Sequence, residues 1–117
     1  MVPKVMEENV QDLALTPIAP TLIWLWSDGT GRIHVFPDPG PCKSDSEGVA
    51  WAARDNYTYD IKFNNPYPFN SDHFNKVGKS GQPSGRPKPG IPHKSYKYDV
   101  TCIETGAVLD PTIKIDP

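Results

Sequence analysis

The sequence predicts an all-β domain built as a sandwich of two sheets, with antiparallel and mixed strands in Greek-key order and one long loop rich in proline and glycine. The chain has 117 residues, which suffices for one two-layer core and is too short for two. Its 14 prolines and 9 glycines, with only 2 methionines, are a poor composition for helices. Apolar and polar residues alternate with period two over residues 57–63 and 95–103, as in strands buried on one face.

Residues 1–20 predict an N-terminal arm or a short, weak helix, and residues 21–117 the single sandwich domain. Met6, Val10 and Leu13 share a helical spacing. Such a helix would have one or two short turns, and it is bracketed by prolines, namely Pro3, Pro17 and Pro20.

The first hairpin is predicted at residues 21–36. Residues 21–26 are apolar on both alternating faces, a pattern typical of a strand that is covered on both sides. One face carries Leu22, Trp24 and Trp26, and the other carries Ile23 and Leu25. The Asp and Gly residues of 27–31 predict a tight turn, so residues 32–36 should return as the second strand.

Four further strands are expected along the chain. Prolines end the first hairpin and begin a linker that runs to about Glu47. The next strands are predicted at 48–53 and 57–63, and the last two at 95–103 and 108–115, joined by a turn at 104–106. The residues expected to face the core are Tyr57, Tyr59, Ile61 and Phe63 in one strand and Tyr96, Tyr98, Val100 and Cys102 in another.

Residues 64–94 predict one long basic loop, because six prolines interrupt any period. From Lys76 to Lys97 there are six Lys or Arg and no Asp or Glu. Such a segment suits an acidic protein surface or another polyanion, whereas the alternative is a solvated loop whose charges only keep a sheet edge soluble. The residues predicted to bind a partner are Lys76, Lys79, Arg86, Lys88 and Lys94, together with Trp24 and Trp26.

Four segments together resemble successive core strands of the cupredoxins: Ile33-His-Val35-Phe-Pro37, Val49-Ala-Trp51, the run from Tyr57 to Phe63, and Tyr96-Lys-Tyr98-Asp-Val100. In that family a His, a Cys, a second His and a Met hold copper. The corresponding positions of this chain are Tyr59, Val100, Ile103 and Val108. The resemblance therefore implies a cupredoxin-like scaffold without its copper ligands, and we expect no cofactor.

No sequence motif indicates an enzyme. The chain lacks the signatures of serine hydrolases, zinc proteases and phosphate-binding loops. Its histidines and cysteines have no metal-ligand spacing, and the cysteines are expected to be buried thiols; these residues are His34, His73, His93, Cys42 and Cys102. Two alternatives stay open: a metal-binding or redox protein with an unconventional site, and a sandwich that binds small ligands or carbohydrates on exposed aromatic rings.

Together these features predict a non-catalytic module that binds another protein, which the basic loop suggests is acidic. The second apolar face of residues 21–26 must be covered by the arm, by the long loop or by another chain, so a homo-oligomer is also considered. The net charge of -2 argues against nucleic-acid binding. With neither a signal peptide nor an apolar span in the sequence as given, a cytoplasmic protein is expected, or a secreted or periplasmic one if a signal peptide was removed.

Overall fold

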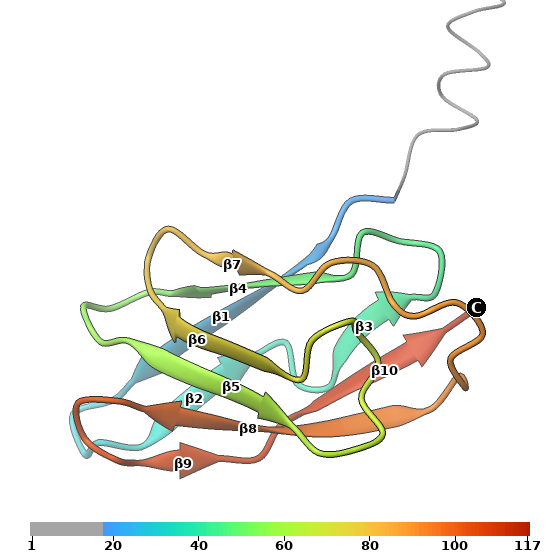
Figure 1. The fold of residues 1–117 in the computed structure, drawn as a ribbon. Helices are drawn as coiled ribbons and strands as arrows, with labels where there is room; N and C mark the ends of the chain where they lie inside the picture. Colours follow the sequence, from blue (N-terminus) through green and yellow to red (C-terminus); the bar gives the residue numbers. More distant parts are fainter. Residues whose placement is uncertain (1–17) are drawn as a thin grey trace, which may run out of the picture.

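The computed structural model describes residues 18–117, so the arm or helix predicted within residues 1–17 lies outside the described part. The described residues form strands and no helix, as the sequence predicts (Figure 1). The strands are β1 (Thr21–Ser27), β2 (Ile33–Phe36), β3 (Gly40–Lys43), β4 (Val49–Ala53), β5 (Tyr59–Phe63), β6 (His73–Val77), β7 (Gln82–Pro83), β8 (Ser95–Cys102), β9 (Val108–Leu109) and β10 (Thr112–Asp116).

These strands make two mixed sheets that curl toward each other as a half-barrel (Figure 1). The smaller sheet has the order β2-β1-β4-β7, in which β1 pairs antiparallel with β2 and parallel with β4. The larger sheet has the order β3-β10-β8-β5-β6, and β9 pairs with β8 beside it. The all-β prediction is confirmed, and the arrangement is compatible with a β-sandwich.

The aromatic core between the sheets is centred on Trp51 in β4. Its ring centroid lies 5.0 Å from that of Phe74 and 5.7 Å from that of Tyr98, with Phe63 and Phe69 also in contact. The indole Nε1 donates to the Tyr98 hydroxyl at 3.3 Å, so the polar atom of the buried tryptophan is satisfied. Edge and tilted ring contacts of this kind stabilise beyond simple area burial.

The predicted inward alternation holds for most of the core strands. Tyr59, Ile61 and Phe63 are buried in β5, as are the four predicted residues of β8. The prediction for Tyr57 is wrong, because it precedes β5 and is 39% exposed. Its amide instead donates to the Asp55 carboxylate at 3.2 Å, which forms a turn before the strand begins.

Residues 64–94 are not one loop, since β6 and β7 lie within them. Phe74 and Val77 of β6 are buried against the core, but Lys76 has φ 56° and the pairing with β5 shifts register there. The irregularity removes the period-two pattern that would have revealed the strand. The 37–47 linker likewise contains β3, which was not predicted.

Of the two faces of β1 that the sequence predicts to be covered, residues 18–117 cover one. Ile23 and Leu25 are fully buried, whereas Leu22 is 56% and Trp24 38% exposed. Residues 64–94 therefore do not cover this side, and the outer face of the smaller sheet is open among residues 18–117.

Candidate protein-binding face

The predicted cations of residues 76–94 differ in their surroundings. Arg86 Nη2 pairs with Glu47 Oε1 at 2.9 Å. Lys88 Nζ lies 3.7 Å from the centroid of the Tyr67 ring, and Lys94 Nζ lies 5.3 Å from that of Tyr96. Lys76 and Lys79 are exposed. Three of the five predicted cations therefore make local contacts within the chain, and whether the segment binds a partner stays a prediction.

The structure brings apolar residues together on the outer face of the smaller sheet instead. Cross-strand partners lie on the same face of a sheet, and the register pairs Trp24 with Phe36, Trp26 with His34, and Leu22 with Ala50. Phe36 is 64% exposed. We call the set Leu22, Trp24, Trp26, Phe36, Ala50, Ala52 and Pro83 the aromatic face; Ala52 and Pro83 belong to it through their pairing with Trp24 and Ala50.

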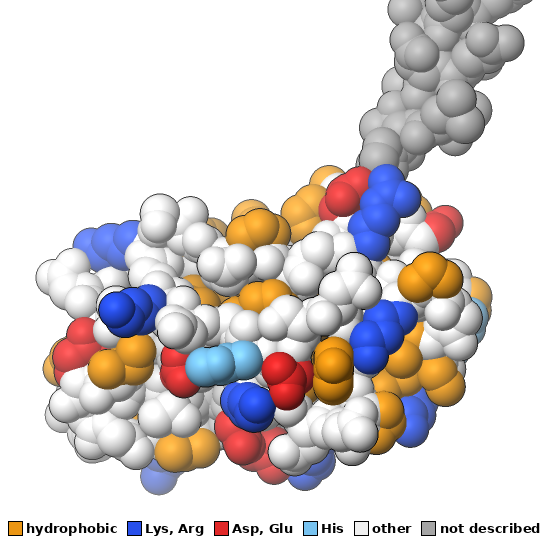
Figure 2. All heavy atoms as spheres, viewed as in Figure 1, with side chains coloured by type: hydrophobic (Ala, Val, Ile, Leu, Met, Phe, Trp, Pro, Cys, Tyr) orange, Lys and Arg blue, Asp and Glu red, His pale blue; other side chains and the backbone are white. Residues whose placement is uncertain are grey.

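The outer face of the larger sheet has the opposite character. Asp60 and Lys62 of β5 point outward beside His73 of β6, with His73 Nε2 2.8 Å from Asp60 Oδ2 and Lys62 Nζ 3.0 Å from Asp72 Oδ2. Figure 2 shows charged side chains of both signs and a histidine over this side. The outer face of the larger sheet is thus solvated and charged, whereas that of the smaller sheet presents apolar residues side by side, a feature that marks interaction sites in folded proteins.

Trp26 stands at one end of the aromatic face between two polar neighbours. Its ring stacks on His34 with centroids 5.3 Å apart and planes 10° apart. The Arg54 Cζ lies 5.2 Å from the same ring centroid. Because β1 lies between β2 and β4, the two neighbours approach from opposite sides, so the tryptophan ring is held upright and its flat faces are occupied.

Asp28 stabilises the turn between β1 and β2, next to Trp26 and His34. Its Oδ1 accepts from Thr30 Oγ1 at 2.6 Å, from Thr30 N at 2.8 Å and from Arg32 N at 3.2 Å, and its Oδ2 lies 2.7 Å from His34 Nε2. The hydrogen bonds from Thr30, followed by that to His34, hold the pKa of the Asp28 carboxyl well below its usual value.

This depressed pKa predicts a pH dependence of stability. A carboxyl whose pKa is lower in the folded chain stabilises it above the unfolded pKa near 4, and the contribution is lost as the pH falls through the folded pKa. Asp28→Asn should therefore lower the melting temperature at pH 6, and the gap from the natural chain should narrow below about pH 3. Thermal unfolding followed by circular dichroism would measure it, and a gap that stays constant down to pH 2 would contradict the assignment.

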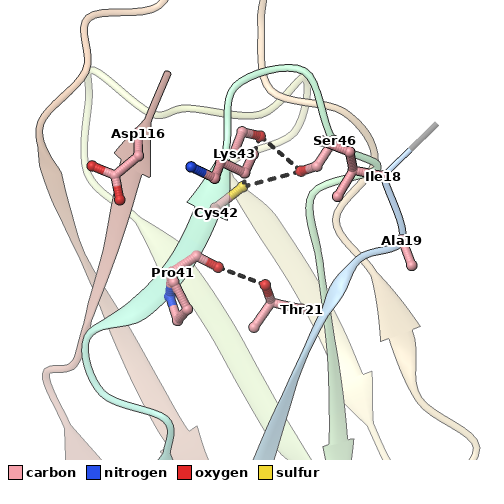
Figure 3. Close-up of a pocket in the computed structure, with 8 residues that line it drawn as sticks. All are labelled: Ile18, Ala19, Thr21, Pro41, Cys42, Lys43, Ser46 and Asp116. Carbon is pink, nitrogen blue, oxygen red and sulfur yellow. Dashed lines mark hydrogen bonds between the residues drawn. The ribbon is translucent and has the colours of Figure 1, made fainter. Parts of the chain in front are cut away.

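A small cavity lies at the seam between the sheets (Figure 3). It measures about 80 Å³ and is bordered by β3 and the start of β1, whereas pockets for drug-sized ligands are several times larger. Cys42 lines it, and burial raises the pKa of this thiol, so the thiolate needed for a nucleophile is disfavoured.

The four positions that the cupredoxin resemblance assigns to copper differ in burial. Tyr59 and Val100 are buried, but Ile103 is 48% and Val108 60% exposed. Cys102, opposite Tyr59 in the register, is a buried free thiol, as expected from the sequence. Between residues 18 and 117, no three His, Cys, Asp or Glu side chains gather closely enough to hold a metal ion.

The positions of the histidines and of Trp24 and Trp26 can be compared with the sequence predictions. His34 and His73 each contact a single carboxylate, and His93 is exposed. Trp24 and Trp26 share one face, as predicted. Phe36 and Arg54 were not predicted as site residues, since only the strand register brings them beside the tryptophans.

Comparison with known proteins adds no relative to this picture. No protein-family model, no curated protein and no solved structure matches the chain. A search of the described residues for a helix long and apolar enough to cross a membrane finds none.

Proposed function

We propose that this protein is a non-catalytic binding module whose aromatic face docks on an apolar surface of another protein. The observation that carries the proposal is the joint exposure of Leu22, Trp24 and Phe36 on one sheet face. Aromatic residues dominate the buried centres of protein interfaces. The outer face of the larger sheet differs, because it carries ion pairs typical of a sheet face that contacts water.

The scaffold is proposed to be a cupredoxin-like Greek-key sandwich that has lost copper chemistry. The order of the core strands supports the likeness, and the residues at the four ligand positions supply no imidazole, thiolate or thioether for a blue-copper site. Among residues 18–117, the side-chain hydrogen bonds of His34 and His73 go to carboxylates and not to a serine, threonine or cysteine side chain, which favours a binding role over an enzyme. The two free, buried cysteines favour a reducing compartment such as the cytoplasm.

Carbohydrate binding is the second candidate, because Trp24 and Phe36 are exposed rings on a sheet face. Sugars stack on the flat faces of aromatic rings, but both faces of Trp26 are occupied by His34 and Arg54. That arrangement favours a protein partner, which can pack against ring edges as well. A change in tryptophan fluorescence that saturates with added oligosaccharide would favour the sugar instead.

The double substitution Trp24→Ser and Phe36→Ser should abolish partner binding while the fold is kept. Truncating two central aromatic residues of an interface costs about 2 kcal/mol or more each, so the affinity should fall by about 1,000-fold if the two losses add. Affinity capture from the native host would identify the partner, and calorimetry with the purified partner would give the affinities.

A matched control lies on the other sheet. Lys62→Ser and His73→Ser alter exposed side chains of the charged face and should leave the affinity unchanged. If the control pair weakened binding as much as the aromatic pair, or if the aromatic pair had no effect, the docking face would be wrongly placed. A circular dichroism spectrum of the Trp24→Ser and Phe36→Ser variant would be recorded first, to establish that it keeps the native fold.

A further inference from the structure

We propose that the partner presents an apolar segment flanked by acidic residues, whose carboxylates meet Arg54 and Arg32 at one end of the aromatic face. This inference rests on the proposed docking function and specifies the chemistry of the partner. It assigns the acidic preference to the smaller sheet rather than to the basic segment of residues 76–94.

Both arginines lie at the same end of the face. Arg54 follows β4, and its amide donates to the Leu25 carbonyl at 2.8 Å, which continues the β1–β4 ladder one step further. Arg32 stands opposite Asp28, whose amide donates to the Arg32 carbonyl at 2.9 Å. Since side chains alternate along a strand, both positions share the face of Trp26.

The two guanidinium groups are available to a partner. Neither Arg32 nor Arg54 forms an ion pair with any residue from 18 to 117. Both arginines are exposed. Arg54 is held against the Trp26 ring, so part of the entropy cost of ordering a long side chain is already met before a partner binds.

The nearby carboxylates are already used within the chain. Asp28 accepts the hydrogen bonds of its own turn and of His34. Asp55 Oδ2 accepts from the Ser27 amide at 2.8 Å and from the Tyr59 hydroxyl at 2.9 Å. The carboxylates at this end therefore accept hydrogen bonds within the chain, whereas the two guanidinium groups form no ion pair with residues 18–117. These donors favour an acidic group on the partner.

The probe for the test is a synthetic peptide with the sequence of residues 4–17, which combines apolar residues with Glu7, Glu8 and Asp12. Its control peptide carries Lys at those three positions. We expect the acidic peptide to bind the full chain at least about fivefold tighter in low salt, and the difference to shrink at 0.5 M salt. Indole NH shifts in NMR spectra would report it, with buried Trp51 as the internal reference.

Substitutions test whether Arg32 and Arg54 cause the preference for the acidic peptide. Arg54→Gln with Arg32→Gln should remove the fivefold difference between the peptides, while Lys62→Gln on the charged face should keep it. Equal binding of both peptides to the natural chain, or a preference that survives the arginine double variant, would overturn the acidic partner while leaving the docking face intact. If neither peptide shifted the Trp24 or Trp26 indole signals, both this inference and the docking function would fail.

Two further experiments test whether the chain itself, and not a separate partner, covers the aromatic face. The first concerns the chain's own N-terminal segment. If it competes for the face, a variant with Val10, Leu13 and Leu15 replaced by Ser would bind the acidic peptide although the natural chain does not. That result would overturn the proposal that a separate partner binds there. Sedimentation velocity at micromolar concentration would show a dimer that Trp24→Ser dissociates if a second copy is the occupant, which would also overturn it.

Discussion

Trp51→Ala is expected to lower the free energy of unfolding by about 3–5 kcal/mol. The indole is fully buried and contacts four aromatic rings, from Phe63, Phe69, Phe74 and Tyr98. Three of these rings come from strands of the larger sheet and one from the loop between β5 and β6. They face the strand β4 that carries Trp51, so they cannot close over the void without moving the strands. Since a domain of this size is stable by about 5–15 kcal/mol in total, the variant should be close to unfolding at 37 °C. Urea denaturation followed by fluorescence and circular dichroism would measure the loss.

Tyr98→Phe is the matched control, because it removes only the hydroxyl that accepts from Trp51 Nε1. Leaving a buried indole N–H without a partner should cost about 1–2 kcal/mol, well below the cost of the cavity. If the two variants were equally destabilised, the hydrogen bond rather than aromatic packing would hold the centre of the core.

The strands predicted correctly are those whose alternation follows from one buried face. Tyr96 and Tyr98 face the core while Lys97 faces solvent, so β8 could be predicted from its sequence. β7 could not, because it is two residues long and ends in Pro83. In β3, Pro41 points outward between the buried Gly40 and Cys42, and a proline in a short segment normally indicates a strand end.

The candidate site was predicted only in part for a similar reason. Trp24 and Trp26 lie two residues apart, so their common face follows from the period of a strand. Phe36 joins them through the antiparallel register of β1 and β2, and Arg54 through the ladder with β4. The apolar pattern of β1 also predicted cover on both sides. Pattern alone distinguishes apolar from polar faces, but it does not say whether the cover comes from the same chain.

Gly48→Ala should destabilise the smaller sheet strongly, by about 4 kcal/mol. Gly48 has φ 91°, a conformation that costs an L-residue about 1–2 kcal/mol. A Cβ there would also overlap the Gly85 carbonyl oxygen and Ser84 Oγ. Ser84 Oγ accepts from the Val49 amide at 2.9 Å and donates to Gly85 O at 2.8 Å. Displacing these groups adds overpacking and a lost buried hydrogen bond.

The same position couples stability to the aromatic face. The Gly48 carbonyl accepts from the Thr21 amide at 3.1 Å, and the Ser84 amide donates to the Val49 carbonyl at 2.8 Å, so β1, β4 and β7 meet at this point. Hydrogen exchange in Gly48→Ala should accordingly speed up first in the amides of these three strands.

Gly106→Ala provides the control, because Gly106 has φ 78° but nothing lies within 4 Å of an added Cβ. It should lose only the conformational cost, about 1–2 kcal/mol. The excess loss in Gly48→Ala over this control, measured by urea denaturation, isolates the contact with residues 84 and 85. Equal losses in the two variants would mean that the loop after β7 yields freely, and that its hydrogen bond to Val49 does not fix the edge of the sheet.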